Sequence, residues 1–338
     1  MEKISISVVI PTCDRKARLR SLLQNLNNST YPINEVIIVD SGEDKLSQTE
    51  YSLFKNLDIQ YIAADRSVCI QRNTGIKMAR SSWIFLCDDD IELPADYLQV
   101  LADHINSYPG AGAVSGQWLQ KEKEKWVATY PLHSGRSLVW RYFFQLDVWG
   151  EVDGVKTGFF SKKIKKDLLK KGNYISKAGW PVLTNFSGDS FIAPVYSLGA
   201  SLVKKSWLIH SPFDEALDRN GIGDNYGVMI DFPVPGVQVI NKAFVYHHRE
   251  PTNRLKRSLQ YYRRVLALDY FIKRKKTPKD VKRRWLIWSL IGNSIRFTFS
   301  GNGRLLRATI KVAMKIILNT NPYYKAFKNG RKITEPNL

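Results

Sequence analysis

The sequence predicts an α/β protein with a mostly parallel central sheet flanked by helices, followed by a basic helical extension. Strand-like and helix-like segments alternate through the first 120 residues, and strands separated by helices form βαβ units with parallel pairing. The basic residues are concentrated elsewhere, because residues 251–338 hold 22 Lys and Arg against 3 Asp and Glu. The body is therefore nearly neutral, although the whole chain carries a net charge of +20.

Five apolar segments of the first part are predicted as strands, because each is rich in β-branched or aromatic residues and bounded by polar residues or turn formers. They span residues 6–10, 35–39, 59–63, 83–87 and 113–116. Helices are predicted between them, where apolar residues recur at helical spacing. These helices span residues 15–26, 68–79 and 95–105.

The second part has a looser pattern, and residues 118–185 give no secure assignment of elements. Strands are predicted at residues 197–203, 237–240 and 243–246, with a helix at residues 212–218. We divide the chain into a domain of residues 1–250, with halves at 1–120 and 121–250, and a helical region of residues 251–338.

Three consecutive carboxylates, Asp88, Asp89 and Asp90, directly follow the fourth predicted strand. Ionised carboxylates repel one another at the end of a sheet unless a cation lies there. If the strand continues, Asp88 and Asp90 point the same way and offer two hard oxygen ligands to Mg²⁺ or Mn²⁺. The alternative is a solvated acidic turn before a helix.

Other polar residues follow the strands at the edge where an open α/β sheet binds ligands. Asp40 could accept the imide N–H of a pyrimidine base, and Arg72 could pair with a diphosphate. Asp224 follows a glycine at the start of a predicted helix. A carboxylate at this position is either a general base or an N-cap. His247 and His248 end a strand, where one of them is either structural or a further metal ligand.

These segments, in this order, resemble the family 2 glycosyltransferases with the GT-A fold. The resemblance covers residues 4–248 and rests on the segments SVVIPTCDR, EVIIVDSG, QRNTGI, FLCDDDIELPADYL, SLGASLV, PFDEAL, GIGDN and VYHH. It implies an inverting, metal-dependent transfer of a sugar from a nucleotide diphosphate to a hydroxyl of a glycan acceptor, in surface polysaccharide or glycoconjugate synthesis.

The resemblance also implies roles for individual residues. The nucleotide-binding set comprises Pro11, Thr12, Asp40, Arg72, Asp88 and Asp89. The DxD pair Asp88 and Asp90, with His247, would hold Mg²⁺ or Mn²⁺. Asp224 would be the catalytic base, although Gly223 stands where the family usually has Glu. Asp189 is the alternative to Asp224. We expect Asp89, pointing away from the pair, to tolerate replacement best.

The acceptor is expected to bind among the aromatic residues between residues 126 and 186, and Trp180 is the candidate that we select. Aromatic rings suit the apolar faces of sugars, although most of these rings are expected to belong to the core. A lipid-linked acceptor would lie at a membrane.

The basic region predicts attachment to an anionic membrane surface through residues 255–315. Apolar and aromatic residues at helical spacing, rimmed by Lys and Arg, are typical of interfacial helices. Nucleic-acid-binding modules seldom contain so much Leu, Ile and Trp, so no nucleic-acid partner is expected. The alternative is that these helices pack against the body.

The three cysteines form no CxxC pair, and the apolar stretch at the start is too short for a signal peptide. We therefore expect a cytoplasmic protein that is peripheral on the inner face of the cell membrane. Two other classes remain open at this stage, a nucleotidyltransferase acting on a sugar phosphate and a non-enzymatic basic adaptor. The first would need a glycine-rich phosphate loop, which PTCDRKARL does not provide.

Overall fold

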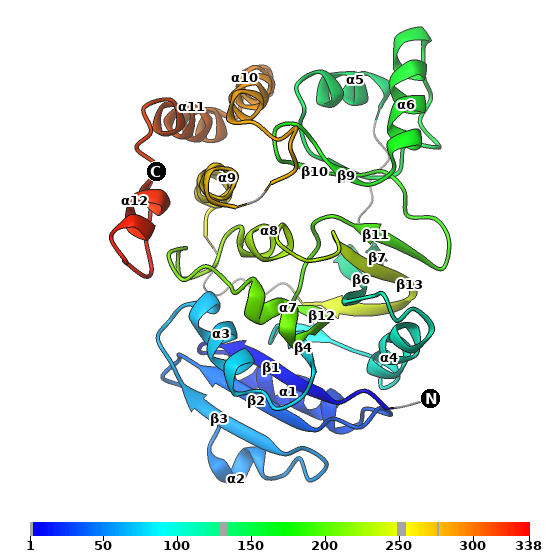
Figure 1. Cartoon of the computed structure of the whole chain (residues 1–338), viewed down its shortest axis with the longest axis vertical. Coiled ribbons are helices and arrows are strands. Elements are labelled where there is room, and N and C mark those ends of the chain that lie inside the picture. Colours follow the sequence, from blue (N-terminus) through cyan, green and yellow to red (C-terminus); the bar gives the residue numbers. More distant parts are fainter. Residues whose placement is uncertain (1–2, 129–133, 249–254, 276) are drawn as a thin grey trace.

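The structure, a computed structural model, describes residues 3–128, 134–248, 255–275 and 277–338. Its centre is a mixed sheet in which eight strands follow the order β11-β13-β6-β12-β4-β1-β2-β3 (Figure 1). The predicted α/β class and sheet flanked by helices are confirmed, but the sheet is mixed rather than mostly parallel, because β5, β7, β11 and β12 pair antiparallel with their neighbours. The strands from β3 to β4 are parallel, and β12 is antiparallel to both of its neighbours.

The strands of the first half lie where the hydrophobic pattern predicts them. They are β1 (Ile6–Thr12), β2 (Glu35–Asp40), β3 (Ile59–Ala63), β4 (Trp83–Cys87), the short β5 (Ile91–Glu92) and β6 (Ala113–Glu122). The remaining strands of the main sheet are β7 (Lys125–Ala128), β11 (Ser190–Ala193), β12 (Ala200–Lys204) and β13 (Val237–His247). A small second sheet contains β8 (Val148–Trp149), β9 (Tyr174–Ile175) and β10 (Pro181–Leu183).

Helices cover both faces of the main sheet because its strands bury alternate residues on opposite sides. Val8 and Ile10 pack with α1 and α4, whereas Val9 packs with α3 on the other face. The helices of the body are α1 (Lys16–Asn27), α2 (Gln48–Tyr51), α3 (Val68–Met78), α4 (Tyr97–Ser107), α5 (Gly135–Phe143), α6 (Phe159–Lys171), α7 (Lys205–His210) and α8 (Asp224–Met229).

Three sequence predictions of the second half need correction. Residues 212–218 form turns rather than a helix, because the Asp214 carboxylate caps the Ala216 N–H and accepts bonds from Tyr270 and Arg274. The strand predicted from residue 197 begins at Ala200, and the strands predicted at 237–240 and 243–246 are one strand with an irregularity.

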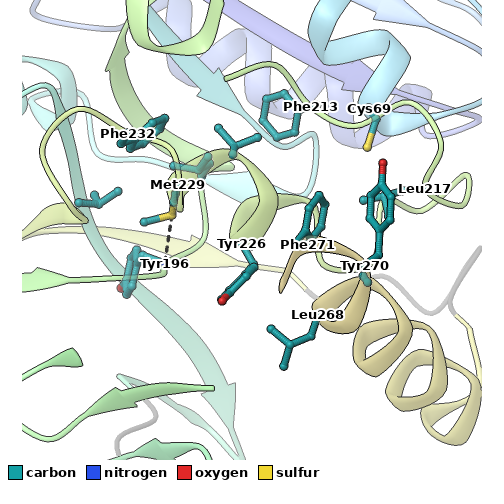
Figure 2. Packing of buried hydrophobic residues seen from close by; sticks show 14 of the residues in the cluster. Cys69, Tyr196, Phe213, Leu217, Tyr226, Met229, Phe232, Leu268, Tyr270 and Phe271 are labelled. Atoms are coloured by element: carbon teal, nitrogen blue, oxygen red, sulfur yellow. Dashed lines mark hydrogen bonds between the residues drawn. The ribbon is translucent and has the colours of Figure 1, made fainter. Parts of the chain in front are cut away.

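The described part of the basic C-terminal region, residues 255–275 and 277–338, contains α9 (Arg257–Arg274), α10 (Arg283–Phe299), α11 (Gly303–Ile317) and α12 (Pro322–Lys328). In Figure 1, α9, α10 and α11 lie above α8, and α12 lies to the left of α8, whereas α2 lies at the opposite end of the molecule. The apolar face of α9 is buried, and Phe271 packs beside Tyr226 of α8 (Figure 2).

One hydrophobic cluster therefore runs from the central sheet into the C-terminal helices. It joins Val9 and Leu86 of the sheet to Tyr262, Leu290 and Val312 of the extension. The division that the sequence predicts at residue 250 lies outside the described residues and stays a prediction. No helix in the described part of the chain combines the length and the apolar character that crossing a membrane requires.

Candidate active site

A cavity of about 750 Å³ lies at the carboxyl edge of the parallel strands. It forms there because β1 and β4 are adjacent and parallel, so the segments that follow them leave the sheet side by side. It collects predicted site residues from five parts of the chain, namely Pro11, Thr12, Arg72, Asp88, Asp89, Asp90, Asp224 and His247.

Arg72 connects the acidic segment, which is Asp88 to Asp90, to Asp224. This arginine lies in α3 and is buried, and its Nη2 donates to Asp88 Oδ1 at 2.6 Å. Its Nη1 donates to Asp224 Oδ2 at 2.5 Å. Burial alone would lower the pKa of Arg72, but the carboxylates of Asp88 and Asp224 raise it. Arg72 is therefore a fixed cation between two residues that are far apart in sequence.

Asp224 is the first residue of α8, and Gly223 before it has φ of 96°. This left-handed conformation favours glycine, which turns the chain into the short helix. The Asp224 carboxylate is 7% exposed and accepts the Asn225 N–H at 2.6 Å. Burial raises the pKa of Asp224 to about 6, although Arg72 acts to lower it. A carboxylate with a pKa in this range is suited to accepting a proton near neutral pH.

The acidic segment differs from its predicted geometry. β4 ends at Cys87, so the strand alternation that would separate Asp89 from its neighbours does not continue, and all three carboxylates line the cavity. Asp89 is held most firmly, since it accepts from Thr12 Oγ1 and from Arg15 Nη1, each at 2.7 Å. The expectation that Asp89 is the dispensable member is therefore not supported by its contacts.

The two histidines have different surroundings. His247 Nε2 lies 3.6 Å from Asp90 Oδ1, and its Nδ1 is buried without a hydrogen-bond partner among the described residues. His248 Nε2 lies 2.8 Å from Glu92 Oε2 instead. Only His247 lines the cavity, so it is the histidine near the predicted metal position.

The described residues contain no group of three or more His, Cys, Asp or Glu side chains that could hold a metal ion by themselves. The donor types nevertheless suit Mg²⁺ or Mn²⁺, because Asp90 and His247 lie together beside the partly exposed Asp88. Mg²⁺ is usually bound by one or two carboxylates, and substrate phosphates and water complete its coordination. The site therefore fits a metal that arrives with a phosphate ligand.

Asp40 is brought near the cavity but does not line it. Its Oδ1 accepts the Gly42 N–H at 2.7 Å, and its Oδ2 accepts the Tyr61 hydroxyl. Both carboxylate oxygens are therefore engaged within the protein. The neighbouring Ser41 lines the cavity together with Pro11 and Thr12.

A second cavity of about 570 Å³ shares Gly223, Asp224 and Asn225 with the first. Trp180 lines this second cavity, although it is 7% exposed and its Nε1 donates to Ser289 Oγ at 3.0 Å. Asp189 is exposed and lines neither cavity, so the structure brings only Asp224 of the two candidate bases to the site.

Sequence reasoning found Arg72 but missed four other arginines of the first cavity, which are Arg15, Arg66, Arg219 and Arg264. Arg15 could have been found, because it follows the first strand in PTCDR, four residues after Pro11. Arg264 could not, since the sequence pattern does not indicate that α9 packs beside α8. Glu335 also lines the cavity, and its carboxylate accepts the Arg219 N–H at 2.9 Å.

The chain is similar to known glycosyltransferases. Residues 7–167 match the family model described as Glycosyl transferase family 2. A glucosyl-dolichyl phosphate glucuronosyltransferase of Haloferax volcanii is 23% identical over 183 residues, which are 52% of this chain and 57% of that protein. The chain thus spans little more than half the length of this curated relative.

Two solved structures share the fold at low sequence identity. The S. aureus protein TarS 1–349 superposes with a TM-score of 0.51 at 13% identity, covering 97% of this chain and 92% of TarS 1–349. The mannosyltransferase PcManGT of Pyrobaculum calidifontis, in complex with GDP-Man and Mn²⁺, gives 0.50 at 13% identity, covering 98% of this chain and 80% of PcManGT. Residues 7–167 of this chain are therefore similar to glycosyl transferase family 2, and the chain shares the fold of TarS 1–349 and PcManGT.

Proposed function

We propose that this protein is an inverting glycosyltransferase that moves a sugar from a nucleotide diphosphate to a hydroxyl group of a glycan acceptor. The observation that carries the proposal is the single cavity in which Arg72 bridges Asp88 and Asp224. Such a transfer needs two components, which are a site for a divalent cation and a general base. Asp88 and Asp90 would provide the first, and the buried carboxylate of Asp224, with its raised pKa, the second. The match of residues 7–167 to glycosyl transferase family 2 favours this reaction over a nucleotidyltransferase or a non-enzymatic adaptor.

The donor would bind along the end of β1 and the acidic segment. Pro11, Thr12 and Ser41 line that part of the cavity and would surround the nucleoside, with Asp40 behind them. Arg15 and Arg72 supply positive charge on either side of the carboxylates, as a diphosphate group requires.

Mg²⁺ or Mn²⁺ is part of the proposal, with Asp88, Asp90 and His247 as the protein ligands. When bound, such an ion stabilises the negative charge that develops on the leaving diphosphate. The GDP-Man and Mn²⁺ complex of PcManGT, a protein of the same fold, makes Mn²⁺ the first metal to test.

Asp224 would act as the catalytic base. Its carboxylate takes the proton from the acceptor hydroxyl as that oxygen forms a bond to the anomeric carbon. The bond between this carbon and the diphosphate breaks, and its electron pair leaves with the phosphate. One displacement inverts the anomeric centre, so no second carboxylate is needed as a nucleophile. Arg72, in contact with Asp224, would hold this carboxylate in place before the acceptor binds.

A lipid-linked acceptor and attachment to an anionic membrane on its cytoplasmic side complete the proposal. The buried apolar face of α9 makes it part of the core, so attachment through residues 255–315 would fall on α10 and α11. Their exposed apolar residues include Ile291, Phe299, Ile310, Met314 and Ile317. Four basic residues of α11 accompany this face, which are Arg304, Arg307, Lys311 and Lys315. Apolar contact combined with basic charge is the chemistry of an interfacial helix.

The test is a panel of sugar nucleotides offered to the intact protein with and without Mn²⁺. We expect one or a few donors to raise the melting temperature only with the metal, and the same donors to be hydrolysed slowly without an acceptor. A panel in which no sugar nucleotide binds, or in which binding is unaffected by chelation of the metal, would contradict the proposal.

A further inference from the structure

The second cavity has three arginines that the proposed reaction does not use. Arg257 and Arg264 come from α9, and Arg296 comes from α10, so all three belong to the basic extension. Arg264 also lines the first cavity, and Asp224 lines both. The extension therefore contributes positive charge to the side of Asp224 where an acceptor would have to approach.

All three arginines are exposed, and other guanidinium groups lie near Arg296. Within the described ranges, no carboxylate lies within 4.0 Å of Arg257, Arg264 or Arg296. Asp147 also lines the cavity, but it lies 3.4 Å from Arg141. Burial lowers the pKa of Arg296, and Arg141 and Arg257 lower it further, whereas Asp147 acts to raise it. An anion bound beside Arg296 would offset the positive charge that Arg141 and Arg257 place near it.

The same cavity is also lined by aromatic residues, one of which has a buried polar atom without a partner among the described residues. Trp149 stacks on Tyr196 with ring centres 5.8 Å apart and planes inclined by 15°. Tyr226 is 7% exposed, and its hydroxyl is buried without a hydrogen-bond partner among the described residues. Figure 2 shows this hydroxyl directed away from the packed side chains of Met229 and Phe232.

The Tyr226 hydroxyl lies toward the second cavity. The Cβ position of Gly179, which also lines this cavity, is 3.4 Å from it. A buried hydroxyl without a partner is unfavourable, because the bond that it made to water in the unfolded chain is lost. A sugar hydroxyl or a phosphate oxygen in the cavity would restore that bond.

We propose that the second cavity binds an acceptor in which a sugar carries a phosphate or diphosphate group, with the phosphate held by Arg257, Arg264 and Arg296. The sugar would lie against Trp149 and Tyr226, with a hydroxyl directed to Asp224. Guanidinium groups match phosphate oxygens in both charge and geometry, and aromatic rings match the apolar face of a sugar. The assignment of this cavity to the acceptor rests on the proposed function, whereas its binding of phosphate does not.

The test is a titration of the full chain with glucose 1-phosphate, followed by tryptophan fluorescence, since Trp149 and Trp180 line the cavity. We expect saturable binding, and an affinity for glucose at least about tenfold weaker, because charge-assisted hydrogen bonds are lost. Arg257→Gln and Arg296→Gln should each weaken binding of glucose 1-phosphate by about tenfold. Arg284→Gln is the matched control, because it removes the same charge from α10 at an exposed position outside the cavity.

Tyr226→Phe tests the cavity wall without changing its shape. It should weaken binding of glucose 1-phosphate while the melting temperature stays equal or rises, because it removes an unsatisfied buried hydroxyl. The proposal is overturned if glucose binds as tightly as glucose 1-phosphate, or if the two arginine variants bind it as the wild type does.

A second titration separates a soluble sugar phosphate from a lipid-linked one. It uses phosphatidylcholine vesicles that contain a polyprenyl diphosphate sugar, with plain vesicles as the reference. Binding that is stronger to these vesicles than to glucose 1-phosphate, and that is weakened by Arg257→Gln, supports the lipid-linked form of the acceptor. Weaker vesicle binding with the same arginine dependence supports the soluble form. Both titrations omit the sugar nucleotide, so a failed donor panel and a failed phosphate titration are separate results.

Discussion

Asp89 shows how much a single carboxylate can organise at the end of a strand. It is 4% exposed and accepts bonds from Thr12 of β1 and from Arg15 at the start of α1. Burial raises the pKa of Asp89 to about 6, although Arg15 and Thr12 act to lower it. The residue therefore ties the nucleotide edge of β1 to the segment that follows β4.

We predict that Asp89→Ala lowers the free energy of unfolding by about 1–3 kcal/mol, because Thr12 and Arg15 lose their acceptor. Urea denaturation would measure the change. Glu124→Ala is a suitable control, since that carboxylate is 92% exposed. If Asp89→Ala lowered the free energy of unfolding no more than the control does, the buried contacts of Asp89 would contribute little to stability.

Asp224 leads to a prediction about pH. Since burial raises its pKa to about 6, a proton occupies the carboxylate increasingly below that pH. A protonated base cannot accept the acceptor proton, so kcat should fall about tenfold per pH unit below the pKa. Rate measurements between about pH 5 and 8, with donor affinity followed in parallel, would check this. A kcat that stays constant down to about pH 5 would contradict the role of Asp224.

At the scale of elements, the site depends on the close approach of β4 and the segment before β12. Asp88 N donates to Gly199 O at 2.7 Å, and a Cβ on Gly199 would lie 2.1 Å from Asp88 Oδ2. Glycine is therefore required at this position for steric reasons, since any side chain would displace the Asp88 carboxylate.

We expect Gly199→Ala to weaken metal-dependent donor binding by at least about tenfold, which is the effect of losing one charge-assisted contact. Isothermal titration with the donor found in the panel would measure it. Gly110→Ala provides the control, because no atom lies within 4 Å of the added Cβ. Equal donor affinity in the two variants would show that the position of Asp88 does not govern binding.

The helices α10 and α11 allow the proposed membrane attachment to be tested separately from catalysis. Ile310→Glu and Met314→Glu place charge on exposed apolar positions and should release the protein from anionic vesicles in a flotation assay. Ile209→Glu on α7 is the control, since Ile209 is 52% exposed and belongs to another helix. Flotation that is unchanged by the α11 variants would contradict attachment through this face.

For the whole molecule, the sequence predicts the nucleotide-binding half well and the C-terminal region only in part. The strands up to Cys87 are short apolar runs with local signals, so their positions and parallel pairing follow from the pattern. The helical character of the extension is also predicted. Its packing is not, because the contact of Phe271 with Tyr226 joins segments whose pairing no local pattern encodes.

The candidate site also has a part that the sequence predicts and a part that it does not. Four of the predicted residues line the first cavity, where Asp88 and Asp90 follow β4, Arg72 lies in α3, and His247 is the last residue of β13. The second cavity could not be predicted, because it exists only where α9 and α10 meet α8 and the small sheet. Trp180 lines it for that reason, although its indole N–H is engaged by Ser289.

The central claim is that one cavity joins a metal-dependent donor site to a separate base. It is tested most directly by comparing transfer and nucleotide binding in Asp90→Ala and Asp224→Asn, with the donor and acceptor that the panels identify. We predict that Asp90→Ala abolishes both transfer and metal-dependent nucleotide binding. We predict that Asp224→Asn abolishes transfer while nucleotide binding survives. Near-normal turnover in Asp224→Asn would contradict the account.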